Sequence, residues 1–234
     1  MSPIATHHPS PGWIDYDTHA RTRRRDDLWG QVRRTVRGQP VADSDIAMIV
    51  GAIRRHLALE PGAVLLDLAC GNGALTARLH PHVSASLGVD ISGYLIDIAR
   101  ERFASARHGF LQQDAADYAE TASDPARFTT ALCYGSLPYL DDGAAARLFR
   151  ALHNRFPAVQ RVMLGNLPDP SRTESFYTGP RPDLQQPRSD IGVWRSPARL
   201  ANLAGAGWRL ETSIMPPAFF AAHYRYDALL LRAS

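Results

Sequence analysis

The sequence predicts an α/β protein whose strands form a mostly parallel sheet. Three short apolar runs each end at an acidic residue: Val64–Asp67, Ser86–Asp90 and Phe110–Asp114. Helical patterns follow the first two runs, and strands that alternate with helices favour parallel pairing. A glycine-rich turn joins the first run to its helix. At 234 residues with 45% hydrophobic content, the chain is long enough for one large core.

The first run and its turn predict a ligand-binding strand–turn–helix unit. Val64 to Leu66 form a buried strand, residues 69–73 read Ala-Cys-Gly-Asn-Gly, and Leu75 and Leu79 lie four apart as on a helix. Glycine adopts positive φ and lets a ligand approach the backbone. Free N–H groups at a helix start favour an anionic or polar group. A glycine turn without any ligand is the alternative.

The glycine spacing argues against two phosphate-binding motifs. A dinucleotide fingerprint needs a third glycine where this chain has Thr76, and a P-loop needs a lysine, whereas the sequence contains none. Asp67 followed by small-x-Gly-x-Gly resembles the first motif of class I S-adenosylmethionine-dependent methyltransferases, with Ala69 in place of its first glycine. The resemblance implies a Rossmann-like, three-layer fold and S-adenosylmethionine as cofactor, with Asp67, Ala69, Gly71 and Gly73 at the cofactor.

Two further acids fit the same interpretation. Asp90 ends the second strand about twenty residues after Asp67, where an acid can accept both ribose hydroxyls of a nucleoside. The resemblance places Ile91 beside the adenine, Asp114 at its exocyclic amine, and the backbone of Ala115 nearby. Each acid alone could equally be an ordinary strand-end or helix-cap carboxylate. We expect Ser92 and Gly93 to start a helix over Tyr94–Phe103.

The fourth strand, Phe128–Tyr134, leads into Gly135-Ser136-Leu137-Pro138-Tyr139, where methyltransferases hold the acceptor. The resemblance assigns Cys133 and Tyr134 to the cofactor and makes Tyr139 a catalytic candidate. Residues 136–139 keep only half of the N/D-P-P-Y/F signature of nucleic-acid amino-methyltransferases, so a turn with a packed tyrosine is the favoured alternative. Two cysteines without His/Cys spacing predict buried thiols and no metal site.

Residues 1–60 show no strand signal and predict a helical lid ahead of a core over 61–234, in a single domain. Helical patterns cover Asp26–Arg37 and Asp43–Leu59, the second capped by Asp43. The aromatic pair Trp13 and Tyr16 would close over the cofactor, with simple packing as the alternative. The arginines between 21 and 37 predict either a solvated helix face or a collar for an anionic substrate.

The C-terminal part predicts the acceptor side. A fifth strand at Arg161–Leu167 precedes a long irregular segment, 168–194, which is typical of a lid or binding loop. A helix at Ser196–Ala204 and strands at Trp208–Met215 and His223–Arg232 complete seven strands, and the resemblance implies an antiparallel last strand. His223 would then start on the active-site face as a general base, or be a packing residue. His19 is a weaker candidate of the same kind. The substrate-facing candidates around the loop are Asn166, Asp169, Arg172, Glu174 and Tyr177.

The predicted function is methyl transfer from S-adenosylmethionine to a small molecule, most simply to a hydroxyl of a sugar or specialised metabolite. An RNA or DNA methyltransferase and a non-catalytic S-adenosylmethionine-binding protein are the alternatives. A net charge of +3 does not favour a nucleic-acid partner. With no long apolar run and no signal pattern, we expect a soluble cytoplasmic protein, monomeric or homodimeric.

Overall fold

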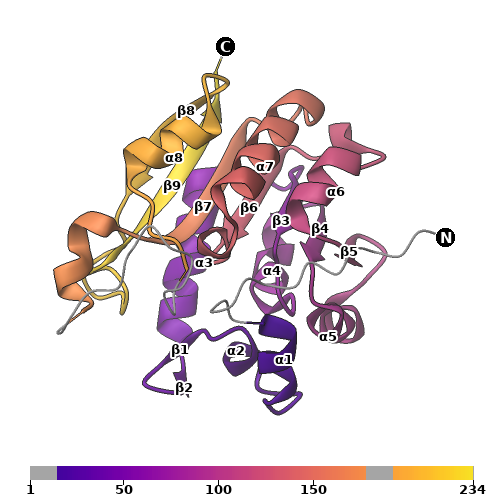
Figure 1. The fold of residues 1–234 in the computed structure, drawn as a ribbon. Coiled ribbons are helices and arrows are strands. Elements are labelled where there is room, and N and C mark those ends of the chain that lie inside the picture. Colours follow the sequence, from indigo (N-terminus) through magenta and orange to yellow (C-terminus); the bar gives the residue numbers. More distant parts are fainter. Residues whose placement is uncertain (1–14, 178–191, 234) are drawn as a thin grey trace.

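A computed structural model describes residues 15–177 and 192–233. Its main sheet has seven strands in the order β5-β4-β3-β6-β7-β9-β8 (Figure 1). Their bounds are β3 (Val64–Leu68), β4 (Ala85–Asp90), β5 (His108–Gln112), β6 (Thr130–Tyr134), β7 (Arg161–Pro168), β8 (Trp208–Ser213) and β9 (Arg225–Arg232). β9 alone runs antiparallel to its neighbours β7 and β8. The predicted Rossmann-like, mostly parallel sheet with an antiparallel last strand is confirmed.

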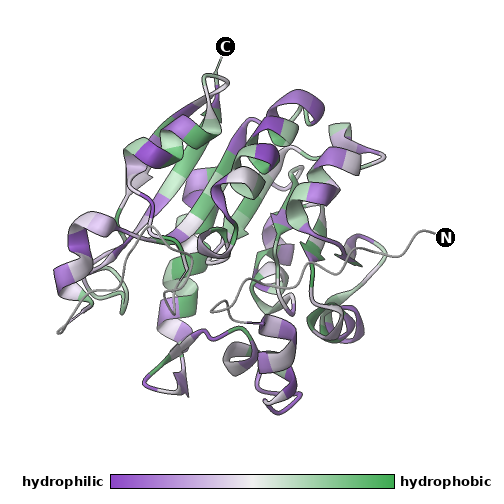
Figure 2. Cartoon of the chain, viewed as in Figure 1, coloured by the Kyte–Doolittle hydropathy of each residue, from purple (hydrophilic) through white to green (hydrophobic). Residues whose placement is uncertain are grey.

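Helices cover both faces of this sheet, which gives three layers. Successive side chains of β3 alternate: Leu66 packs with α6 (Ala115–Thr121), α7 (Asp142–Arg155) and α8 (Pro197–Ala204), and Leu65 with α3 (Asp43–Leu57) and α4 (Ala74–Leu79). α5 (Gly93–Phe103) packs through Ile96 and Ala99 on Phe110 of β5. Figure 2 shows hydrophobic residues along the strands and hydrophilic ones on the outer turns of the helices.

Local sequence signals explain most helix starts. Ser92 caps α5 by accepting a hydrogen bond from the Leu95 N–H, as expected, and Ser196 caps α8, whose first residue is Pro197. The capping role predicted for Asp43 is wrong. Asp43 is the first helical residue of α3, and Ala42 occupies the cap position without a side-chain bond. α3 ends at Leu57, because Ala58 adopts a left-handed conformation.

The N-terminal segment contains one of the two predicted long helices, α3, but not the one expected over 26–37. α1 (Tyr16–Arg21) and α2 (Leu28–Gln31) are short, and a small hairpin, β1 (Thr35–Val36) and β2 (Gln39–Pro40), follows them. The helix expected over 26–37 and the absence of strands before residue 60 were therefore wrong. The hairpin turns at Arg37 and Gly38, which both have positive φ, and such a turn suits a two-residue hairpin.

The strand order reverses between β3 and β6, since β4 and β5 extend the sheet on one side of β3 and the chain then returns to the other. Ligands of open α/β sheets bind outside the carboxyl ends of the strands at such a switch point. α1 and α2 lie across this end of the sheet (Figure 1). Within the described ranges, no helix has the length and apolar character needed to cross a membrane.

Candidate active site

A cavity of about 1180 Å³ opens at the carboxyl ends of β3 to β7 beneath the N-terminal segment. Pockets for one small ligand usually measure about 300–1,000 Å³, so this cavity has room for two small molecules. Ten of the predicted site residues line it: Tyr16, Asp67, Ala69, Gly71, Asp90, Ile91, Asp114, Ala115, Tyr134 and Tyr139. Gly73, Cys133 and His223 are not part of the lining.

The turn after β3 depends on left-handed backbone conformations. Gly71 has φ of 60° and Gly73 of 72°. Ala69 also has a positive φ, 56°, a conformation that normally favours glycine. A Cβ on Gly71 would lie 2.8 Å from Cγ1 of Val32, and one on Gly73 would lie 2.7 Å from Cε1 of Phe110. Gly71 thus leaves space for the N-terminal segment, and Gly73 for β5.

Asp90 ties the end of β4 to this turn. Its Oδ2 accepts a hydrogen bond of 2.8 Å from the Gly71 N–H, and its Oδ1 accepts one of 2.9 Å from the Ser92 N–H. Each carboxylate oxygen has a second lone pair that can still accept a hydrogen bond from a hydroxyl group. Ile91 follows with 59% of its surface exposed, so an apolar side chain is available to flank a flat ring. The geometry fits a ribose beside a base.

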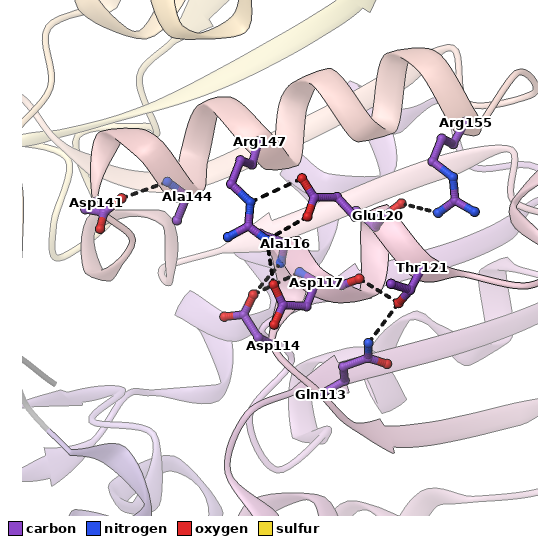
Figure 3. Close-up of polar contacts among 11 residues, drawn as sticks. Gln113, Asp114, Ala116, Asp117, Glu120, Thr121, Asp141, Ala144, Arg147 and Arg155 are labelled. Atoms are coloured by element: carbon purple, nitrogen blue, oxygen red, sulfur yellow. Dashed lines mark hydrogen bonds and ion pairs between the residues drawn. The ribbon is translucent and has the colours of Figure 1, made fainter. Parts of the chain in front are cut away.

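Asp114 lies at the far end of the cavity as the N-cap of α6. Its Oδ1 accepts from the backbone N–H groups of Ala116 and Asp117, at 2.9 and 3.0 Å, as Figure 3 shows. Its Oδ2 has no hydrogen bond among the described residues and remains able to accept one from a ligand amine. Arg147 of α7 reaches across to Asp117 and Glu120, both at 2.6 Å, and closes this end (Figure 3).

Asp67 is a buried acid at the base of the cavity. Thr76 donates a hydrogen bond of 2.5 Å to its Oδ2. Burial raises the pKa of Asp67 to about 7, although the Thr76 hydroxyl and the nearby Arg34 charge favour the ionised form. A cationic ligand group beside this carboxyl would be stabilised by its deprotonation. Thr76 occupies the position of the third glycine in a dinucleotide motif. In this chain it orients Asp67 through that hydrogen bond.

Residues that the sequence did not single out attach the N-terminal segment. Asn72 donates to the Leu28 carbonyl at 2.7 Å and to Oε1 of the buried Gln31 at 2.8 Å. Asp17 of α1 accepts from the Ser92 hydroxyl at 2.6 Å and from the Tyr94 N–H at 3.0 Å. Asn72 lies between the two glycines of the cofactor motif, and this position is the only sequence signal that could have indicated it. No sequence signal indicated Asp17.

The opposite half of the cavity, next to β6 and β7, is rich in aromatic rings. Tyr16 and Tyr139 meet edge to face with centroids 5.2 Å apart. Burial and the neighbouring Tyr139 raise the pKa of Tyr16 well above its usual value. Asn166 lines this half, and both its Oδ1 and the Tyr134 hydroxyl are buried without a partner among the described residues. The remaining rings of the lining are Trp29, Phe219, Phe220 and Tyr224.

Other predicted residues lie elsewhere. β9 begins at Arg225, so the strand start predicted at His223 is wrong; His223 is exposed and contacts the Tyr224 ring at 4.8 Å. Cys133 is buried in β6 as predicted, and burial raises its pKa to about 12. Cys70, also predicted to be buried, is only part-buried after the adjacent strand β3 and lines the cavity. His19 binds the Gly30 carbonyl through Nε2.

The loop candidates Asp169, Arg172, Glu174 and Tyr177 do not line the cavity. Trp13 and residues 178–191 of the predicted loop lie outside the described residues.

Comparison with known proteins finds one sequence family that matches part of the chain. Residues 65–156 match the sequence family described as "Methyltransferase domain". No curated protein sequence matches the chain.

Three crystal structures show the same fold at low sequence identity. A protein from Pyrococcus horikoshii OT3 is 19% identical, with a TM-score of 0.63 over 82% of this chain and 91% of that one. Magnesium protoporphyrin IX methyltransferase from Synechocystis PCC 6803, with bound S-adenosylmethionine, is 17% identical, with a TM-score of 0.58 over 96% and 100%. Geranyl diphosphate C-methyltransferase from Streptomyces coelicolor A3(2) is 16% identical, with a TM-score of 0.60 over 80% and 76%.

Proposed function

We propose that this chain, a class I S-adenosylmethionine-dependent methyltransferase by its domain match and its fold, methylates a hydroxyl group of a small organic molecule. One observation carries the proposal. The cavity at the switch point has a polar half and an adjoining aromatic half. Asp67, Asp90 and Asp114 lie in the polar half, at the ends of successive strands. The first half suits a nucleoside with an amino-acid tail, and the second leaves room for an acceptor.

The polar half fits S-adenosylmethionine group by group. Asp90 would accept hydrogen bonds from the ribose hydroxyls. The Oδ2 of Asp114, which no described residue hydrogen-bonds, would accept one from the exocyclic amine of adenine, and Ile91 and Ala115 would pack against the ring. Asp67, whose pKa is raised to about 7, would pair as a carboxylate with the ammonium group of the methionine tail. The positive φ of Gly71 brings the bare backbone close to that tail.

When bound, S-adenosylmethionine supplies a methyl group on a positively charged sulfur, which is already strongly electrophilic. The protein then has mainly to align the two reactants. Tyr139 would accept a hydrogen bond from the acceptor hydroxyl and orient its lone pair. The buried Oδ1 of Asn166, which no described residue hydrogen-bonds, would accept from a second donor group of the acceptor. Since His223 is exposed outside the lining, we assign the direct contact to Tyr139. The hydroxyl proton would leave to solvent water as the O–CH3 bond forms and the S–CH3 bond breaks, and His223 is the alternative proton acceptor.

The aromatic rings also bear on the acceptor class. Rings favour a flat or apolar acceptor, so a specialised metabolite fits better than a sugar with polar groups on every side. The similar structures share no common acceptor: one is a magnesium protoporphyrin IX methyltransferase and another is a geranyl diphosphate C-methyltransferase. We infer a small-molecule acceptor, and a nucleic acid is the alternative.

Calorimetric titration with S-adenosylmethionine and S-adenosylhomocysteine, with NAD as the control, tests the cofactor. We expect binding of both sulfur nucleosides and none of NAD. Formation of S-adenosylhomocysteine with hydroxylated small molecules, compared with RNA and DNA, then tests the acceptor class. Turnover with nucleic acids alone would contradict the proposal, and so would cofactor binding that never leads to methyl transfer.

A further inference from the structure

Three arginines face the aromatic half of the cavity: Arg33, Arg34 and Arg225. Arg34 lies between two rings, with its guanidinium carbon 5.5 Å from the centroid of Trp29 and 5.4 Å from that of Tyr134. Arg225 lies 4.8 Å from the Tyr224 centroid. Ring contacts of this kind fix the orientation of a guanidinium while leaving its in-plane N–H groups free for a ligand.

These cations make no ion pair in the part of the chain that the structure describes. The cavity arginines of the opposite half are paired, Arg21 with Asp17 and Arg147 with Asp117, both within 2.7 Å. In contrast, no carboxylate among the described residues lies within ion-pair distance of Arg33, Arg34 or Arg225. Arg225 donates one N–H to the Asn166 carbonyl, and four guanidinium hydrogens remain.

The nearest acids offset the charge of this half only in part, and Asp67 is the one that acts on Arg34. Burial raises the pKa of Asp67 to about 7, and burial also raises the pKa of Asp227, whose Oδ2 lacks a hydrogen-bond partner among the described residues. The charges of Arg33 and Arg225 oppose the rise in the pKa of Tyr16, so both lie near its phenol. A half-enclosed site with several unpaired cations strongly favours an anionic ligand.

On these contacts we propose that the methyl acceptor is a flat organic anion, whose carboxylate or phosphate binds Arg34 and Arg225 while its ring packs against Tyr16 and Tyr139. Arg33 stands exposed at the rim of the same half and adds to the attraction. The buried Tyr134 hydroxyl, which has no partner within residues 15–177 and 192–233, can donate to the same anion. This inference deepens the proposed function and rests on it. The carboxylate of the methionine tail is the other anion that could reach Arg34.

Matched probes separate an anionic acceptor from a neutral one. Protein saturated with S-adenosylhomocysteine is titrated with para-hydroxybenzoate, phenyl phosphate and the neutral para-hydroxybenzamide. We expect the anions to bind about tenfold or more tightly than the amide, the size expected for hydrogen bonds to charged groups. Equal binding of the anions and the amide overturns the inference, and so does no binding of any probe.

Variants assign the anion to its arginines. Arg34→Gln and Arg225→Gln should each abolish the preference for the anions, whereas Arg34→Lys and Arg225→Lys should restore part of it. Arg209→Gln, which removes the same charge from the exposed surface of β8, should leave the preference unchanged. Retention of the preference in both glutamine variants overturns the inference.

A cofactor comparison distinguishes the two sources of the anion. S-adenosylhomocysteine carries the methionine carboxylate, and methylthioadenosine lacks it. We expect both glutamine variants to bind the two nucleosides as the parent does. If the variants lose affinity for S-adenosylhomocysteine alone, the arginines hold the cofactor and the inference fails. Failure of the parent protein to bind either nucleoside would instead refute the proposed function. The preference for anionic probes could then still be measured on the protein without cofactor, so the two failures are distinguishable.

Discussion

The carboxylate of Asp90 accepts a hydrogen bond from the backbone N–H of Gly71, with 2.8 Å between Oδ2 and the nitrogen. The bond connects the end of β4 to the glycine turn after β3, so the two halves of the proposed cofactor site hold each other in place. Burial raises the pKa of Asp90, and the N–H groups of Gly71 and Ser92 oppose that rise. Both oxygens of Asp90 are therefore already held by backbone N–H groups before a ligand binds.

Asp90→Ala should weaken binding of S-adenosylhomocysteine by about 10- to 100-fold, because one or two hydrogen bonds to a charged group are lost. Calorimetric titration measures the change. Asp97→Asn on the exposed side of α5 is a matched control and should bind like the parent. Parent-like binding by Asp90→Ala would remove Asp90 from the site.

Gly73→Ala should lower the free energy of unfolding by about 1–3 kcal/mol. The residue has φ of 72°, and a Cβ there would lie 2.7 Å from Phe110 and 3.0 Å from Ala99. Gly62→Ala is the control, since a Cβ at Gly62 meets nothing within 4 Å. Urea unfolding followed by circular dichroism compares the two. Equal stability of both variants would show that the turn tolerates a side chain at residue 73.

The sheet and the turn could be predicted because their signals are local. Val64 to Leu66 are continuously apolar, and Ser92 caps its own helix. In contrast, Leu28, Trp29, Val32 and Val36 are spaced as on one helix face, yet the chain leaves the helix after Gln31. There Val32 contacts Gly71, and Arg37 and Gly38 turn the chain into a hairpin. Tertiary contacts and a positive-φ turn overrode the helical spacing.

The acceptor half could be predicted only in part. The position of Tyr139 after β6 follows from the order of strands, which the sequence indicates. Arg225 and Arg34 are almost two hundred residues apart in the chain, and each looks like any other arginine in a sequence that has no lysine. Only the sheet order β6-β7-β9 and the docking of the N-terminal segment bring them to one cavity. No local pattern carries that information.

Binding of S-adenosylhomocysteine should depend on pH through Asp67. The pKa of Asp67 is raised to about 7 by burial, and a ligand ammonium would require its ionised form. Affinity should thus rise by up to about tenfold per pH unit below about pH 7 and level off above it, with a proton released on binding. Titrations in buffers of different ionisation enthalpy measure the proton. Asp67→Asn should remove the dependence, and proton uptake on binding would contradict the assignment.

The same group makes a prediction about stability. The pKa of Asp67 is higher in the folded protein than the value of 3.8 expected for an unfolded chain, so the folded state binds more protons between these two values. The stabilisation by its protonated form is complete below about pH 4 and is lost as the pH rises through about 7. Between about pH 5 and pH 7, Asp67→Asn should therefore flatten the decrease in the free energy of unfolding. An unchanged slope in urea unfolding would show that Asp67 titrates normally.

Tyr139→Phe and His223→Ala distinguish the two candidates for the acceptor contact. The Tyr139 ring lines the cavity against Tyr16, whereas His223 is exposed outside it. We expect Tyr139→Phe to lower kcat by about tenfold or more, as for loss of one positioned hydrogen bond, and to leave cofactor affinity unchanged. His223→Ala should change kcat by less than about twofold. The opposite ranking, together with a lost acidic limb in the pH profile, would identify His223 as the base.

Asn72 should control the attachment of the N-terminal segment to the cavity. Its side-chain amide donates to the Leu28 carbonyl and to Gln31, and Gln31 in turn donates to the Arg24 carbonyl at 2.9 Å. Asn72→Ala leaves these acceptors without their hydrogen bonds, so the free energy that holds the N-terminal segment on the cavity should fall by about 1–3 kcal/mol. Hydrogen exchange should accelerate over residues 28–34 and stay unchanged in β3 and β6. Because this segment carries Arg34, the variant should also lose preference for anionic probes. Unchanged exchange over 28–34 would show that the segment is held by its other contacts, chiefly those of Asp17 in α1 with Ser92 and Tyr94 at the start of α5.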